Sequence, residues 1–213
     1  MLFRSGQVHI VAGSLRNSRI DVPDAPGLRP TPDRVRETLF NWLAPEIDGA
    51  RCLDLFAGTG ALGIEALSRG AAAAVFVDDD VAACAVLRDN LRALGLGARA
   101  VVLAQRVERV LPRLLQRGLV PGAAAPPYGY VFADPPYRDV PVAVPALLRF
   151  FFAHQAALLG PDGVLVVEHD RRTELTADLP RTDLRRYGDT ALSFFAAPGT
   201  TPTSHATQPG DPT

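Results

Sequence analysis

The chain has 213 residues, of which 47% are hydrophobic and 21% charged, and it carries a formal net charge of −1. Length and composition of this kind predict a single folded domain and exclude a disordered or fibrous chain. The near-zero charge excludes a strong overall field toward nucleic acid or membranes, so any basic surface must be local.

A short β-hairpin is predicted near the N-terminus. Residues 7–12 alternate apolar and polar side chains, a turn-rich stretch follows at 13–18, and a second short run covers 19–22. This pattern is typical of a hairpin. Residues 1–36 contain six arginines and three aspartates, which gives +3 in a chain that is −1 overall. We therefore expect this region to carry the local basic surface.

A helix is predicted to begin at residues 31–33. Thr31 suits the N-cap, Pro32 the first helical position, and Asp33 the positive end of the helix dipole. Apolar side chains then recur at helical spacing, at Val35, Leu39, Trp42 and Leu43. This face of the helix is expected to pack on the rest of the protein.

Strands and helices alternate from residue 51 onward. Strands are expected at 52–56, 74–77, 99–103, 130–133 and 163–167, with helices at 61–69, 81–94, 107–116 and 142–159. Two more strand-like runs lie at 183–187 and 191–196, and a flexible surface loop is expected at 118–129. The alternation predicts an α/β fold whose parallel sheet has helices on both faces and binds ligands at the carboxyl ends of its strands. Residues 198–213 predict a disordered tail, because twelve of the sixteen are Pro, Gly, Ser or Thr.

The sequence gives no sign of a disulfide, a metal site, a signal peptide or a membrane span. Cys52 and Cys84 lie in apolar surroundings and are expected to pack as free thiols, and the four histidines lack metal-ligand spacing. No signal peptide is visible, and no apolar run reaches the roughly 18 residues of a membrane span. We expect a cytoplasmic protein with no metal site and no membrane contact.

A glycine-rich turn follows the first strand of the alternating region. The sequence from Asp54 to Gly63 contains a G-x-G-x-x-G pattern, and Asp78 follows at the end of the next strand. This arrangement fits a dinucleotide, and it equally fits S-adenosylmethionine, whose adenosine needs the same close backbone approach and the same ribose acceptor. Asp54 favours S-adenosylmethionine, since a carboxylate suits the amino group of a methionine moiety better than a pyrophosphate. The alternative is a turn whose glycines only allow tight packing, as we expect for Gly63 itself.

Residues 134–137 form a second motif, Asp-Pro-Pro-Tyr, directly after the fourth strand. The two prolines stiffen the loop and remove two donors, so the loop presents a carboxylate and backbone carbonyls as acceptors. Such acceptors bind the N–H hydrogens of an exocyclic amino group and direct the nitrogen lone pair at a methyl donor. Tyr137 is expected to stack on the target base, a contact worth about 1–3 kcal/mol. The alternative is a rigid turn whose tyrosine covers the core.

Three segments resemble the RsmD family of bacterial 16S rRNA guanine-N2 methyltransferases. They are the arginine-rich segment Arg-Pro-Thr-Pro-Asp-Arg-Val-Arg-Glu-Thr-Leu-Phe-Asn-Trp-Leu at 29–43, the glycine-rich segment at 54–70 and the motif at 134–137. Residues 187–190 also resemble the last-strand region of some members. The similarity covers roughly residues 7–197, and the arginine-rich segment distinguishes this family from other amino methyltransferases.

The resemblance implies a class I methyltransferase fold: a seven-stranded Rossmann-like sheet of order 3-2-1-4-5-7-6, with the last strand antiparallel and a small N-terminal β-hairpin extension. It implies an extension at 1–30, a methyltransferase domain at 31–197 and a tail at 198–213. S-adenosylmethionine is the implied cofactor, held by Asp54, Phe56, Ala57, Gly58, Thr59, Gly60, Asp78 and Arg106. The target amino group is implied to lie at Asp134, Pro135, Pro136 and Tyr137. Arg106 stands where many members have Asp or Asn near the adenine.

The basic extension is interpreted as an RNA clamp. Phosphate contacts are expected from Arg16, Arg19, Arg29, Arg34, Arg36 and Arg138. The alternative is an ordinary solvated surface, in which Arg36 and Glu37 serve local ion pairs.

These observations predict an enzyme that transfers a methyl group from S-adenosylmethionine to the N2 amino group of a guanine in 16S rRNA, either free or in a 30S assembly intermediate. A monomer is expected. The same motif would also serve an adenine-N6 or cytosine-N4 methyltransferase on DNA or RNA, although no separate DNA-recognition domain is evident. An NAD-dependent dehydrogenase would lack a suitably placed proton donor in this lysine-free chain. The intact motif at 134–137 disfavours an RNA-binding protein without activity.

Overall fold

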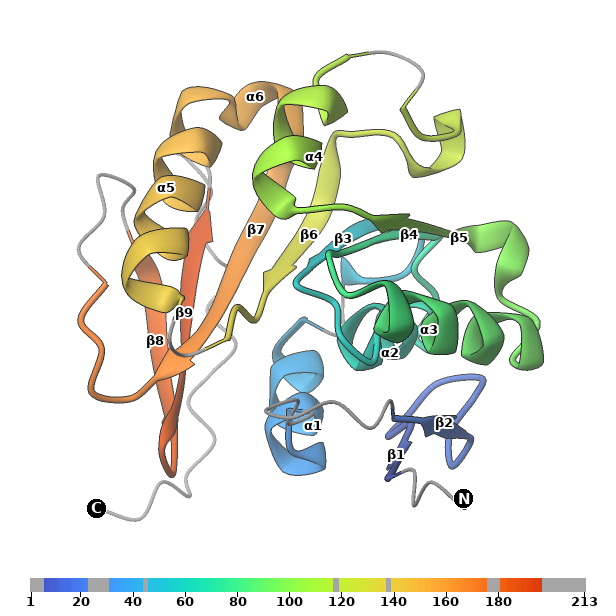
Figure 1. Cartoon of the computed structure of the whole chain (residues 1–213). Coiled ribbons are helices and arrows are strands. Elements are labelled where there is room, and N and C mark those ends of the chain that lie inside the picture. The colour runs from blue at the N-terminus through green and yellow to red at the C-terminus, as the bar shows by residue number, and fades with distance from the viewer. Residues whose placement is uncertain are drawn as a thin grey trace.

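A seven-stranded mixed sheet forms the centre of the computed structural model (Figure 1). The structure describes residues 6–22, 31–43, 46–116, 119–136, 139–175 and 181–196. The strands are β3 (Arg51–Leu55), β4 (Ala73–Asp78), β5 (Ala100–Ala104), β6 (Tyr128–Ala133), β7 (Leu159–Asp170), β8 (Arg181–Tyr187) and β9 (Thr190–Ala196). Their order is β5-β4-β3-β6-β7-β9-β8, which reads 3-2-1-4-5-7-6 when β3 is counted as the first strand. The predicted sheet order is therefore confirmed.

The directions of the strands bring several chain segments to one edge of the sheet. The strands from β5 to β7 run parallel, and β9 is antiparallel to both of its neighbours. Leu55 of β3 pairs with Val77 of β4 and with Ala133 of β6, and Ala133 pairs with Val167 of β7. Residues at the ends of these strands therefore gather at one edge, which we call the carboxyl edge.

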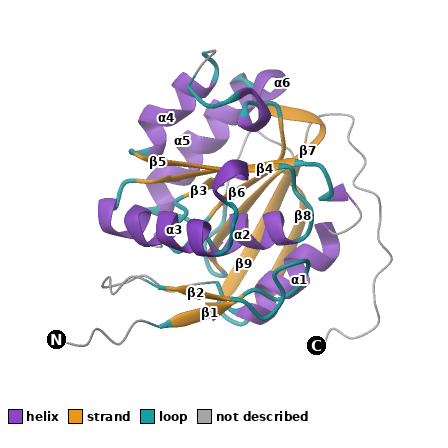
Figure 2. Ribbon diagram, turned by 90° about the vertical axis from the view of Figure 1, so that its right-hand side faces the viewer, coloured by secondary structure: helices purple, strands orange, loops and turns teal. Residues whose placement is uncertain are grey.

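Helices cover both faces of the sheet (Figure 2). The helices α1 (Asp33–Leu43), α2 (Ala61–Ser68) and α3 (Val81–Ala93) enclose a first core, and α4 (Val107–Leu114), α5 (Val140–Ala153) and α6 (Gln155–Leu158) enclose a second. Alternate residues of each strand enter the two cores, as Cys52 and Leu53 of β3 do. Burial on both faces explains why the central strands are almost continuously apolar.

The helix predicted at 142–159 is divided into α5 and α6. His154 separates them: its φ of −123° lies outside the helical range, and its N–H donates to the carbonyls of Phe150 and Phe151. Apolar residues continue across this break, so the apolar pattern alone predicted one helix. The chain then enters β7 at Leu159.

The loop predicted at 118–129 is only partly a surface loop. Within its described residues, Val120 and Ala124 are buried in the second core, and β6 already begins at Tyr128. Small apolar residues can either fill a core or allow a surface turn. Composition alone does not distinguish these two uses. The tail predicted at 198–213 lies outside the described residues.

The predicted N-terminal hairpin is confirmed as β1 (Gln7–His9) and β2 (Arg19–Asp21), which pair antiparallel. Buried polar side chains of α2 and α3 hold it in place. Glu65 accepts hydrogen bonds from the N–H groups of Val11 and Ala12, at 2.8 and 3.0 Å. The side-chain oxygen of Asn90 accepts from the N–H of Asp21, and its amide nitrogen donates to the Asp21 carbonyl. The Asn90 amide thus bonds β2 as the backbone of a neighbouring strand would. The hairpin is therefore fixed to the α2–α3 layer.

Candidate functional site

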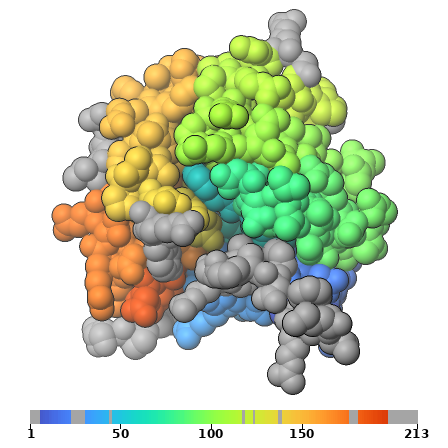
Figure 3. Space-filling view, in the orientation of Figure 1, coloured from blue at the N-terminus to red at the C-terminus, as the bar shows by residue number. Residues whose placement is uncertain are grey.

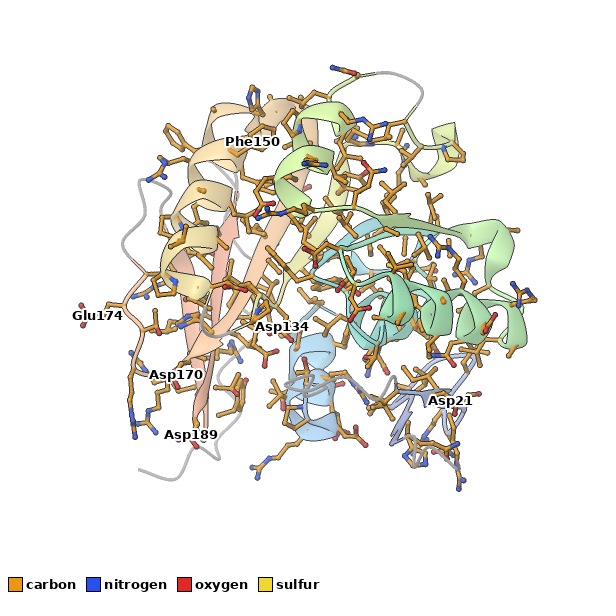
Figure 4. All side chains as sticks on the ribbon, viewed as in Figure 1. Asp21, Asp134, Phe150, Asp170, Glu174 and Asp189 are labelled. Carbon is orange, nitrogen blue, oxygen red and sulfur yellow. The ribbon has the colours of Figure 1, made fainter. Side chains whose placement is uncertain are left out.

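The carboxyl edge collects acidic side chains from four strands. They are Asp54 on β3, Asp78 at the end of β4, Asp134 just after β6 and Glu168 near the end of β7. In Figure 4, Asp134 lies between the end of β6 and α1. The space-filling view shows a recess in this part of the molecule, between the start of α5 in yellow and the β4–α3 region in green (Figure 3).

The glycine-rich turn between β3 and α2 has a backbone conformation that favours glycine. Gly58 and Gly60 have φ values of 50° and 75°, and a Cβ at Gly60 would lie 2.3 Å from Leu87 of α3. Asp78 ties the turn to β4, because one of its carboxylate oxygens accepts from Gly58 N at 2.7 Å and the other from Asp80 N at 2.9 Å. The turn is therefore held rigidly, with little side-chain bulk of its own.

The other residues predicted at the cofactor differ in exposure. Ala57 and Thr59 are buried within the turn, and the Thr59 hydroxyl accepts from the first N–H of α2 at 3.3 Å. Phe56 is half-buried and begins the turn with a φ of 59°. Arg106 is exposed at the start of α4, where its Nε lies 3.4 Å from Glu108. Contact of Arg106 with a ligand stays a prediction.

Asp54 is buried below the turn, with 2% of its surface exposed. Its Oδ2 accepts from Gly63 N at 2.9 Å, and so satisfies one of the N–H groups that the first turn of a helix leaves unpaired. A Cβ on Gly63 would lie 2.3 Å from the ring of Phe76, so this glycine serves packing, as predicted. Burial raises the pKa of Asp54 to about 8. A cation beside Asp54 would favour its ionised form.

Asp134 begins a stiff loop between β6 and α5. Pro135 is buried and Pro136 exposed, and neither has an N–H to donate. The Pro136 carbonyl accepts from Asp139 N at 2.7 Å, which joins the loop to the start of α5. Burial and two neighbouring carboxylates raise the pKa of Asp134 well above its usual value. Tyr137, which completes the motif, lies outside the described residues.

Two residues of the site were missed in the sequence. Glu168 is 6% exposed. It lies beside Asp134 because the residues directly before these two, Ala133 of β6 and Val167 of β7, pair in the sheet. The Thr31 hydroxyl reaches the site from the segment before α1 and donates to Glu168 Oε2 at 3.0 Å. Burial raises the pKa of Glu168 to about 7. An acidic residue directly after the apolar run at 163–167 was the signal that could have identified Glu168.

Thr31 does not cap α1, which corrects the prediction for the start of this helix. The N–H groups of Val35 and Arg36 donate to the Pro32 carbonyl, so Pro32 occupies the N-cap and the helix begins at Asp33. Thr31 therefore lies one residue before the cap. Its hydroxyl donates to the buried carboxyl group of Glu168 on β7, and this tertiary contact replaces the local cap.

Arg36 is buried, so the predicted contact of its side chain with RNA phosphate is wrong. It is 0% exposed, and its Nη2 donates to the His9 carbonyl and to Asp33. Arg36 thus fixes the hairpin to α1. Among the other predicted phosphate contacts, Arg16, Arg19 and Arg34 are exposed, whereas Arg29 and Arg138 lie outside the described residues.

The part of the chain that the structure describes also bears on the cysteines, on metal binding and on membrane spans. Cys52 and Cys84 are buried free thiols, as predicted. No three His, Cys, Asp or Glu side chains among the described residues are placed to hold a metal ion. No helix in these ranges is long and apolar enough to cross a membrane.

The sequence matches a known family along most of its length. The family described as conserved hypothetical protein 95 matches residues 8–196. Ribosomal RNA small subunit methyltransferase D of Escherichia coli K12 is 50% identical over 134 residues, which are 63% of this chain and 62% of that protein. This match thus spans less than two thirds of that relative's length. YlbH of Bacillus subtilis 168, a candidate rRNA methyltransferase, is 36% identical over 195 residues, which are 90% of this chain and 100% of that protein.

Solved structures share the fold. The structure of yhhF, a candidate methyltransferase of Escherichia coli, has a TM-score of 0.70 at 37% identity and covers 90% of this chain and 98% of that one. SMU.776, a candidate methyltransferase complexed with SAH, has a TM-score of 0.67 at 16% identity over 92% of this chain and 57% of that one, which shows the fold alone. The family match includes the hairpin, the glycine-rich turn and the 134–137 motif. The chain therefore belongs to the family described as conserved hypothetical protein 95, which is the RsmD family that its motifs resemble.

Proposed function

We propose that this protein methylates the N2 amino group of a guanine in 16S rRNA, with S-adenosylmethionine as the methyl donor. The observation that carries the proposal is the place of Asp134, which follows β6 at the carboxyl edge, beside the strand that leads into the glycine-rich turn. The relative named ribosomal RNA small subunit methyltransferase D supports an rRNA substrate. The choice of guanine N2 rests on the arginine-rich segment at 29–43 and on the fit of the 134–137 motif to an exocyclic amino group.

The glycine-rich turn fits the proposed cofactor. Gly58 and Gly60 leave the backbone open to close approach, and Asp54 offers a carboxyl group to the amino end of a methionine moiety. Asp78 keeps unused lone pairs on both oxygens for the ribose hydroxyls. When bound, the cofactor supplies a methyl group on a sulfonium sulfur. We include Phe56, Ala57, Thr59 and Arg106 as further proposed contacts.

Asp134 and its prolines are proposed to orient the target amino group. The lone pair of such a nitrogen is delocalised into the base, so the free amino group is a poor nucleophile. The Asp134 carboxylate and the loop carbonyls accept its N–H hydrogens and direct the lone pair toward the methyl carbon. Pro135 and Pro136 contribute no N–H that would compete for the carboxylate. Tyr137 is proposed to stack on the base, which must be unpaired or flipped out to reach the site.

N2-methylguanosine is the expected product when the protein is incubated with isotope-labelled S-adenosylmethionine and unmodified small-subunit RNA, either naked or in assembling particles. Digestion to nucleosides and mass spectrometry identify the labelled base. The form of RNA that gives more label shows when during subunit assembly the enzyme acts. Labelled N6-methyladenosine or N4-methylcytidine would contradict the guanine proposal, and cofactor binding without label in any nucleoside would contradict RNA methylation.

Exposed arginines on the N-terminal elements are proposed to hold the RNA backbone. Arg16 and Arg19 lie on the hairpin and Arg34 on α1, and both elements lie below the sheet in Figure 1. Arginine contacts to phosphate release counterions, so binding through them weakens as salt increases. The fixed position of the hairpin against α2 and α3 would give these contacts a defined geometry.

The Arg16→Ala/Arg19→Ala double variant is expected to bind RNA about tenfold more weakly at low salt, and to reduce the slope of log affinity against log salt by up to about two. RNA titrations at several salt concentrations measure both quantities. Arg149→Ala removes an exposed arginine from the second half of α5, on the other face of the sheet from the hairpin, and is expected to behave as wild type. An unchanged salt slope in the double variant would exclude the hairpin from the RNA interface.

A further inference from the structure

Glu168 places a second carboxyl group beside Asp134 at the carboxyl edge. The two residues directly follow a pair of matched positions on the neighbouring strands β6 and β7. Side chains alternate along each strand, so each of the two lies on the same side as the residue two positions earlier. Those earlier residues, Phe132 and Val166, belong to the first core. Neighbouring strands lie about 4.8 Å apart, so both carboxyl groups can contact one bound base.

The order of the strands sets which part of a base meets each carboxyl group. The glycine-rich turn, where the cofactor is proposed to bind, follows β3, and the sheet continues from β3 through β6 to β7. Asp134 is therefore one strand nearer to the methyl donor than Glu168 is. A base whose amino group meets Asp134 extends one strand farther, toward Glu168.

Thr31 holds Glu168 as a hydrogen-bond acceptor. Glu168 is 6% exposed, and the Thr31 hydroxyl donates to its Oε2 at 3.0 Å. Among the described residues, no donor bonds the other oxygen, Oε1. Burial raises the pKa of Glu168, and the hydrogen bond from Thr31 limits that increase because it stabilises the ionised form. Glu168 therefore offers an acceptor beside Asp134, with its side chain fixed from the segment before α1.

Guanine is the base whose edge matches two adjacent acceptors. Its N1–H lies next to its N2 amino group, so two neighbouring donors point in the same direction. Adenine and cytosine instead carry an unprotonated ring nitrogen, N1 or N3, next to their amino group. A carboxylate opposite that nitrogen would face a lone pair and would lose its water without gaining a hydrogen bond, which is costly in a buried site.

We propose that Glu168 accepts the N1–H of the target base, and that it thereby selects guanine over adenine and cytosine. Asp134 accepts from the N2 amino group in the same complex, one strand nearer to the methyl donor. Glu168 is then a specificity-determining residue, and Thr31 is a positioning residue that acts through it. This inference rests on the proposed function, and it names the group in the site that chooses the base.

2-Aminopurine tests the N1–H contact, because it keeps the amino group on C2 but has an unprotonated N1. Two RNAs compete in one reaction, with guanine or 2-aminopurine at the position where N2-methylguanosine is mapped. The assay is run at about pH 8, above the pKa of about 7 of Glu168, and the product ratio gives the ratio of kcat/KM. The wild-type protein is expected to prefer guanine by about 100-fold or more, because the analogue leaves the carboxylate unpaired.

Glu168→Gln is expected to reduce this preference to less than about tenfold, because a glutamine amide offers an oxygen to N1–H or an N–H to an unprotonated N1. 2-Aminopurine also lacks O6, but that difference is the same for both proteins. Asp134→Asn is the matched control: its rates on both RNAs are expected to fall while the preference stays at the wild-type value. An unchanged preference in Glu168→Gln, or a wild-type preference below about tenfold, would overturn the proposal.

Thr31 provides a second pair of variants that leaves both carboxyl groups in place. Thr31→Val removes the hydroxyl and is expected to lower the preference by about tenfold, whereas Thr31→Ser is expected to keep it. If Glu168→Gln does not fold, this comparison decides, and equal preferences in the two Thr31 variants would overturn the proposal. If the wild-type protein forms no N2-methylguanosine, the proposed function and this inference fail together. If it forms the product and Glu168→Gln keeps the wild-type preference, the inference alone fails.

Discussion

Asp134→Ala is expected to lower methyl transfer to RNA by about 10³-fold or more, while the affinity for S-adenosylmethionine changes less than about threefold. The substitution removes the carboxylate that is proposed to orient the amino group, and one such catalytic group contributes about 10²–10⁴-fold. Cofactor binding is spared because the glycine-rich turn and its acids belong to β3 and β4. Single-turnover rates at saturating cofactor and calorimetric titration with S-adenosylhomocysteine measure the two quantities.

Asp162→Ala is the matched control for Asp134→Ala. Asp162 is an exposed carboxylate near the start of β7, at the opposite edge of the sheet, and its removal is expected to leave both quantities unchanged. A rate for Asp134→Ala within tenfold of wild type would exclude the carboxylate from the chemistry. Parallel loss of cofactor affinity would show that Asp134 supports the whole edge, and would contradict its separate role at the target base.

Features that depend on neighbours in the chain could be predicted from the sequence. The glycine-rich turn requires positive φ at Gly58 and Gly60, and glycines stand there. The loop after Asp134 is stiff because its two consecutive prolines fix the backbone φ angle. The strands from β3 to β7 were predicted because apolar runs alternate with helical patterns, although the order of the sheet came from the family resemblance.

Features that depend on distant contacts could not be predicted in the same way. Thr31 and Glu168 are 137 residues apart in the sequence, and a threonine before a proline and an aspartate is typical of a helix cap. Arg36 lies 27 residues from the His9 carbonyl that it bonds, and an arginine beside a glutamate suggests a solvated surface. In both cases burial, which the folded arrangement decides, changes the role of a polar side chain.

Asp54→Asn is expected to weaken the binding of S-adenosylhomocysteine by about 10- to 100-fold and to stabilise the free protein at neutral pH. The weakening follows because a hydrogen bond to a charged group, worth about 1.5–3 kcal/mol, becomes a bond to a neutral amide. The stabilisation follows because the wild-type carboxyl group is buried, whereas an asparagine oxygen can still accept from Gly63 N without a charge. Calorimetry and thermal unfolding measure the two effects.

The pH dependence of the same variant tests the cause. The unfolded chain loses the Asp54 proton above about pH 4, whereas the folded free protein keeps it until about pH 8. Through this group, the free energy of unfolding of the wild-type protein should therefore fall as pH rises from about 4 to about 8. Asp54→Asn should show a smaller fall, to which Asp134 and Glu168 still contribute in the same direction.

The affinity of the wild-type protein for S-adenosylhomocysteine should rise over this pH interval, because the ammonium group of the ligand binds the ionised form of Asp54. The affinity of Asp54→Asn should lack that contribution. If instead the stability of the variant falls with pH as steeply as that of the wild type, Asp54 is already ionised in the free protein. The hydrogen bond from Gly63 and the N-terminus of α2 would then stabilise the carboxylate by themselves, and its charge would serve the fold before any ligand binds.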